Sequence, residues 1–171
     1  MKILYVLLFV FAAQISIFAQ SEKEVAGIRT EVNAVNKSAK NLKKEKKNVS
    51  GLSLEGAEAT YFLSGTEIKK VTATLYGETY KSNVEVYYRD GAPIFAFAKL
   101  NKYDAPISAN KSPQIVSSEE QRIYFSNGKT IKAMIGKTDL KMTDARFAEI
   151  EKSLTEISQT LMKAYSEKEG E

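Results

Sequence analysis

The chain has 171 residues, of which 43% are hydrophobic and 27% charged, and its formal net charge is +4. These proportions are typical of one globular domain rather than of a disordered chain. Cys and His are absent, which excludes disulfides, thiol nucleophiles, Ser-His-Asp triads, and zinc or haem sites built on these side chains. The charge is too small to indicate a nucleic-acid partner.

The N-terminal segment has the layout of a secretory signal peptide. Lys2 is followed by an unbroken apolar run over residues 3–13, and the segment ends in the small residue Ala19. An uncut membrane anchor is the alternative, although a spanning helix needs about 20 apolar residues. We therefore expect a signal peptide over 1–19 and an exported protein (periplasmic, outer-surface or secreted) with a single domain over 20–171.

The first predicted element of this domain is an amphipathic helix over residues 21–47. Its apolar residues recur at spacings of three and four, which places them on one stripe: Val25, Ile28, Val32, Val35, Ala39 and Leu42. This stripe either covers a sheet or forms the coiled-coil seam of a weak dimer. The sequence thus predicts a monomer or a weak dimer.

Lysines gather near the end of this predicted helix, at Lys43, Lys44, Lys46 and Lys47. Cations at a helix C-terminus are favoured by the helix macrodipole, so they need no partner to explain them. The alternative is contact with anionic lipid headgroups or polyanionic glycans.

Residues 57–135 predict an antiparallel meander of about six strands. Alternating apolar and polar residues, as in Val84 to Arg89, are typical of half-buried strands. Asp90-Gly91 and Asn127-Gly128 predict two tight hairpins, because both central positions of such turns need positive φ. The run over 94–100 is apolar on both faces and predicts a central strand.

A segment without periodicity, residues 101–118, separates the two hairpins and carries two prolines. Loops of this length are uncommon in compact domains and are often functional, so we expect either a binding loop or a plain connection. A second amphipathic helix is predicted over 144–167, with Asp144 at its N-cap. The fold class is therefore α+β, with both helices expected to cover the same face of the sheet.

Two segments, 84–98 and 121–135, share an aromatic residue, a turn glycine and an Ile-x-Ala pattern. They resemble the hairpin units of MORN-type repeat proteins over about fifteen residues each. The whole layout of signal, helix, meander and helix is similar to small exported Gram-negative proteins of unassigned function. This resemblance implies a fold and no activity.

The tyrosine-rich strands and the loop point to binding, because tyrosine offers an apolar face and a hydroxyl to proteins and sugars. The predicted function is non-catalytic binding of an unknown protein or glycan through an exposed sheet face and the loop. The candidate residues are Tyr76, Glu85, Tyr87, Arg89, Tyr103 and Asp104. No cofactor or metal site is predicted.

Two alternatives remain open at this stage. One is a carrier of an apolar small ligand in a cavity between sheet and helix. The other is a carbohydrate-active enzyme with two close carboxylates, although no spacing in the sequence selects such a pair. The chain carries no motif of a specific chemistry, so we expect that it is not an enzyme.

Overall fold

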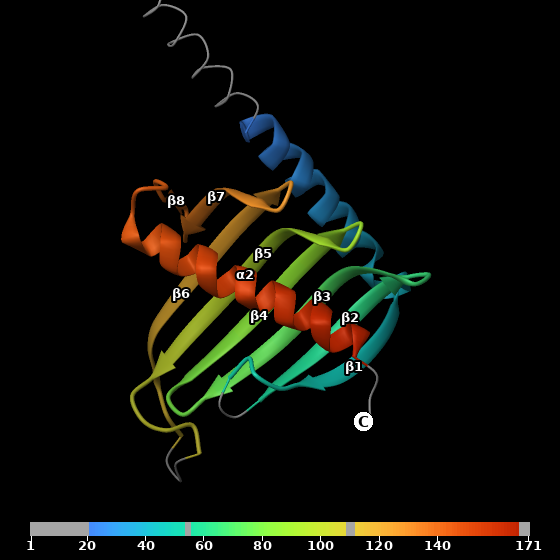
Figure 1. The fold of residues 1–171 in the computed structure, drawn as a ribbon. Helices are drawn as coiled ribbons and strands as arrows, with labels where there is room; N and C mark the ends of the chain where they lie inside the picture. The colour runs from blue at the N-terminus through green and yellow to red at the C-terminus, as the bar shows by residue number, and fades with distance from the viewer. Residues whose placement is uncertain (1–20, 54–55, 109–111, 168–171) are drawn as a thin grey trace, which may run out of the picture.

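The computed structural model describes residues 21–53, 56–108 and 112–167. The predicted signal peptide over 1–19, with cleavage near Ala19, lies outside the described residues. Within them the chain is α+β, with one antiparallel sheet of eight strands and two helices (Figure 1). This confirms the predicted class and corrects the expected strand count.

The sheet is a meander in which each strand pairs with the next along the chain, from β1 to β8. Antiparallel neighbours need only short connections, so the order in the sequence becomes the order in space. The strands are β1 (Lys43–Val49), β2 (Ala57–Ser64), β3 (Glu67–Gly77), β4 (Tyr80–Arg89), β5 (Ala92–Tyr103), β6 (Ile115–Ser126), β7 (Lys129–Ile135) and β8 (Thr138–Asp139).

Both predicted hairpin turns are confirmed. Asp90 and Gly91 have φ of 51° and 77°, and Asn127 and Gly128 have φ of 51° and 73°. Asp and Asn tolerate the left-handed region because their short side chains can bond locally, and Gly has no Cβ to clash. The strand over 94–100 is also central, since it lies within β5 and is flanked by β4 and β6.

The first helix is shorter than predicted. It occupies residues 21–38 of the described chain and ends in the short 3-10 helix η1 (Ala39–Asn41), so the predicted extension to Lys47 is wrong. Residues 43–49 instead form β1, paired with β2 from Lys43↔Leu63 to Val49↔Ala57. The lysines are compatible with the end of a helix, as predicted, and also with an edge strand. At a sheet edge, charged side chains hinder pairing with other chains.

The connection between β5 and β6 is shorter than the predicted loop over 101–118. Strand β5 runs to Tyr103 and β6 starts at Ile115, leaving residues 104–114 between them. The added strand residues are mostly unburied, and they include the exposed apolar residues Ile115 and Val116. Pairing between the two strands stabilises them in place of burial, as in Asn101↔Ser118.

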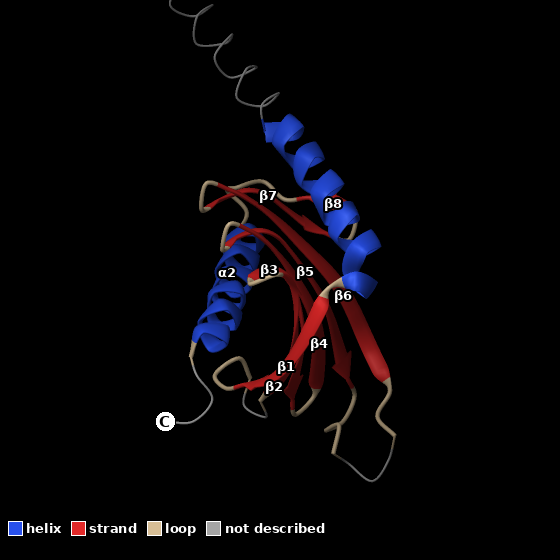
Figure 2. Cartoon of the chain, turned by 90° about the vertical axis from the view of Figure 1, so that its right-hand side faces the viewer, coloured by secondary structure: helices blue, strands red, loops and turns tan. Residues whose placement is uncertain are grey.

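Helix α2 (Ala145–Ser166) matches the second predicted helix and begins after an N-cap at Asp144. It lies across the inner face of the sheet, which curves around it (Figure 2). Its buried residues include Ile150, Leu154 and Leu161. Two buried tyrosines of the sheet also bond it: the hydroxyls of Tyr61 and Tyr88 donate to backbone carbonyls of α2, at 2.8 and 2.9 Å.

The N-terminal helix (residues 21–38) lies on the opposite, outer face (Figure 2). Val25 and Ile28 of the helix are buried against Tyr87, Phe95 and Tyr124 of the sheet. The expectation that both helices cover one face is therefore wrong. The aromatic residues on the outer side of β4–β6 need their own cover, because burying each contributes about 1.5–3 kcal/mol.

Truncating the centre of the inner core should destabilise the fold. Leu161 is fully buried under α2, and we expect Leu161→Ala to lower the free energy of unfolding by about 2–5 kcal/mol through lost contacts and a cavity. Urea denaturation followed by circular dichroism measures the free energy of unfolding. Lys152→Ala, at an exposed position of the same helix, should change this free energy by about 0.5 kcal/mol or less.

Candidate functional site

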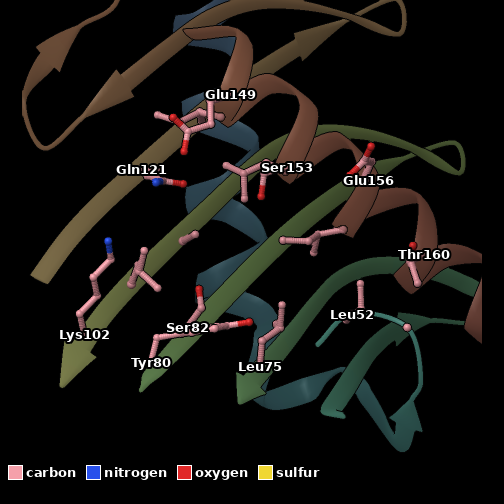
Figure 3. A pocket seen from close by; sticks show the side chains of 16 residues that line it. Leu52, Leu75, Tyr80, Ser82, Lys102, Gln121, Glu149, Ser153, Glu156 and Thr160 are labelled. Atoms are coloured by element: carbon pink, nitrogen blue, oxygen red, sulfur yellow. The ribbon is translucent and has the colours of Figure 1, made fainter. Parts of the chain in front are cut away.

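A groove of about 570 Å³ lies between α2 and the inner face of the sheet (Figure 3). Helix α2 forms one wall, strands β3 to β6 form the floor, and the β1–β2 connection closes one end with Gly51 and Leu52. The volume falls within the range of small-molecule sites, about 300–1,000 Å³.

Apolar side chains line the floor and the helix wall. The floor carries Leu75, Ala98 and Leu100, and α2 adds Ile150, Leu154 and Ile157. The floor residues alternate with outward-facing residues along β3 and β5, so the period of the strands places them on the inner face. A ligand in the groove would therefore remove apolar surface of its own and of the protein from water.

Polar groups line the margins of the groove. Tyr80, Ser82, Lys102 and Gln121 come from the sheet, and Figure 3 shows them opposite Glu149, Ser153, Glu156 and Thr160 of α2. Lys102 is the one cation among the lining residues. The described residues hold no ion-pair partner for it, so its ammonium remains available to an anionic group.

Tyr80 owes its place in the groove to Gly77. The two residues pair directly across the β3–β4 hairpin. A Cβ on Gly77 would lie 2.1 Å from Cε1 of the Tyr80 ring, so the ring packs directly over the glycine backbone. Any side chain at position 77 would push the ring away from this position.

Two carboxylates, Glu149 and Glu156, line the groove. Glu149 and Glu156 are seven residues apart on α2, or about 10.5 Å along the helix axis. The two carboxyl groups of glycosidases are about 5–9.5 Å apart. Glu149 is also held by Arg146 at 2.6 Å, which in turn pairs with Glu119.

Three of the predicted binding residues lie beside the N-terminal helix instead. Tyr87 is 1% exposed and donates from its hydroxyl to Glu85 at 2.6 Å. The Lys70 ammonium donates to Glu85 at 2.7 Å and to the Asn36 side chain of the helix at 3.0 Å. Burial raises the pKa of Tyr87, and so does its bond to Glu85, so the hydroxyl stays a donor.

Arg89 completes this arrangement by pairing with Glu31 on the same helix. Glu85, Tyr87 and Arg89 therefore contact the N-terminal helix or its polar partners, and they do not form the open surface expected from the sequence. The alternation itself was predicted correctly. What the pattern could not indicate was that the helix lies on this face.

The other three predicted residues are scattered. Tyr76 lies on the uncovered part of the outer face, with the Lys81 ammonium 5.5 Å from its ring centroid. The Tyr103 backbone donates to Thr79, and the Asp104 carboxylate accepts from the Gln114 backbone at 2.9 Å, so both stabilise the β5–β6 connection. The six residues do not form one site.

Sequence reasoning missed the groove residues because their individual signals are ordinary. Leu75, Ala98 and Ile150 are apolar residues at core spacing, and in the structure they belong to the buried core while also lining the groove. A lysine at position 102, in phase with the apolar residues of β5, was the available signal.

The acid stability of the protein should depend on Glu85. Burial raises its pKa, but hydrogen bonds from Lys70 and Tyr87 and the charge of Lys70 lower it more, so its pKa lies below the usual 4.5. Ionised Glu85 therefore stabilises the fold above about pH 4.5, and this contribution is lost as the pH falls through its lowered pKa.

We expect Glu85→Gln to flatten the dependence of unfolding free energy on pH below 4.5, measured by urea denaturation between pH 7 and pH 3. Glu78→Gln, at an exposed turn position, is the matched control and should keep the wild-type profile. An unchanged profile in Glu85→Gln would contradict the assignment.

No group of acidic side chains among the described residues is arranged to hold a metal ion. None of the described helices combines the length and apolar character needed to cross a bilayer. Comparison with protein-family models, with curated proteins and with solved structures gave no match to this chain.

Proposed function

We propose that the protein binds one amphipathic small molecule, without catalysis, in the groove between α2 and the sheet. The observation that carries this proposal is the groove itself, about 570 Å³ in volume, with an apolar floor and polar margins. The sequence left open a carrier of an apolar small ligand, and the polar margins of the groove favour an amphipathic ligand instead.

The chemistry of the lining supports a ligand with an apolar body and an anionic or hydroxylated end. The body would contact six apolar side chains on two sides, at about 25 cal/mol for each Å² of apolar surface removed from water. Most of that surface would come from the ligand and from half-buried Leu100 and Ile157, because the other four side chains are already buried in the core. Lys102 and the hydroxyls of Tyr80 and Ser82 lie on the sheet side, where they can bond the polar end.

A fluorescent probe with this chemistry, 1-anilinonaphthalene-8-sulfonate, tests the proposal. We expect saturable binding of one molecule per chain, seen as increased emission. Ser153→Phe places a large side chain in the groove from an exposed helix position and should weaken binding by at least about tenfold, or about 1.4 kcal/mol.

Ala148→Phe is the matched control, because it makes the same aromatic side chain at an exposed position of α2 outside the groove. It should keep the wild-type affinity, and circular dichroism should show both variants folded. Equal affinity in Ser153→Phe and wild type would mean that the probe binds elsewhere and would refute the groove as the site.

The Gly77–Tyr80 contact gives a second test. Gly77→Ala must displace the Tyr80 ring, so we expect a loss of about 1–3 kcal/mol in stability and a weaker affinity for the same probe. Gly27→Ala is the control, since a Cβ there meets nothing within 4 Å. Titration and urea denaturation of the two variants separate the effects, and wild-type affinity in Gly77→Ala would show that the position of Tyr80 does not matter.

A further inference from the structure

The N-terminal helix covers only part of the outer face, and strands β1 to β6 continue beyond it (Figure 2). Strand pairing places six outward-facing residues in one row across these strands, beside the helix. In strand order they are Lys46, Thr60, Thr72, Glu85, Phe97 and Arg122. We define the outer strip as this row, the outward-facing residues beyond it, and Lys44, which lies two positions before Lys46 on the same face of β1.

The outer strip is long and none of its first row is buried. From Lys46 on β1 to Arg122 on β6 the row crosses five strand spacings, or about 24 Å at roughly 4.8 Å each. The next row repeats the polar character, with Asn83 opposite Lys99. A surface of this length suits an extended chain better than a compact small molecule.

Cations of the outer strip outnumber the carboxylates available to them. Glu85 pairs with Lys70, and Glu120 pairs with Arg122, while the exposed Glu58 on β2 has no ion pair with any described residue. Four lysines on this face have no ion pair with any described residue: Lys44, Lys46, Lys81 and Lys99. The strip therefore carries a net positive charge, which Glu58 reduces on β2.

Half-buried aromatic rings accompany these cations. The Lys44 ammonium lies 5.4 Å from the Phe62 centroid, and the Lys81 ammonium 5.5 Å from that of Tyr76. The Arg122 guanidinium lies 5.0 Å from the Phe97 centroid. Each ring holds its cation against the sheet, which lowers the entropy that the cation loses on meeting an anion.

We propose that the outer strip binds a linear polyanionic glycan, laid across the strands from β1 to β6. Spaced cations match the repeated anionic groups of such a polymer, and threonine and asparagine side chains between them can bond its hydroxyls. The surface is convex, so a flexible chain can follow it, whereas a flat bilayer would touch it along a narrow line. The site lies on the face opposite the groove and does not depend on the proposed function.

Dextran sulfate is the probe, with uncharged dextran of the same length as its reference. We expect the protein to bind dextran sulfate and not dextran, with an affinity that falls as salt rises. Two double variants, Lys44→Gln with Lys46→Gln and Lys81→Gln with Lys99→Gln, should each weaken binding about tenfold at low salt. Both double variants must weaken binding if the glycan spans the outer strip.

A control with the same change in net charge is Lys129→Gln with Lys152→Gln, two exposed lysines outside the strip. It should reduce binding by about twofold or less, the effect of net charge alone. An equal loss in the control would overturn the proposal in favour of non-specific attraction. A loss confined to one double variant would overturn the spanning mode, and tighter binding to vesicles containing anionic phospholipid would assign the strip to membranes instead.

Discussion

A sheet that is apolar on both sides of its central strands determines the rest of this structure. Such a sheet is stable only if each side is covered, because aromatic and aliphatic side chains stabilise the fold only when they are removed from water. The two helices meet this need separately. Helix α2 covers the inner side, where Tyr61 and Tyr88 bond its carbonyls, and the N-terminal helix covers aromatic residues such as Tyr87.

Each helix covers less area than the sheet face on which it lies. Both proposed sites lie on the parts of the two faces that the helices leave uncovered. A 22-residue helix crosses the curved inner face and leaves the groove floored by Leu75 and Leu100 along one flank. Residues 21–38 cross the outer face and leave the lysine-bearing strip open. The polar network of Lys70, Glu85 and Asn36 holds the N-terminal helix against the outer face.

Much of the fold was predictable because its signals are local. Asp90-Gly91 and Asn127-Gly128 require a backbone conformation that few other residue pairs adopt, and α2 has a long apolar stripe with few interruptions. Residues 43–49 were mispredicted because this lysine-rich segment has no strong preference of its own for strand over helix. Pairing with β2 supplies the hydrogen bonds that make them a strand, and that pairing is a tertiary event.

The sequence by itself determined the turns, the period of each strand and the amphipathic character of both helices, since these depend on neighbouring residues. It also excluded chemistry that needs His or Cys. Only the tertiary structure decided which face each helix covers, and with it the burial of Tyr87 and the position of the groove. The physical reason is that an apolar stripe specifies burial but not its partner, and a sheet apolar on both sides accepts a helix on either.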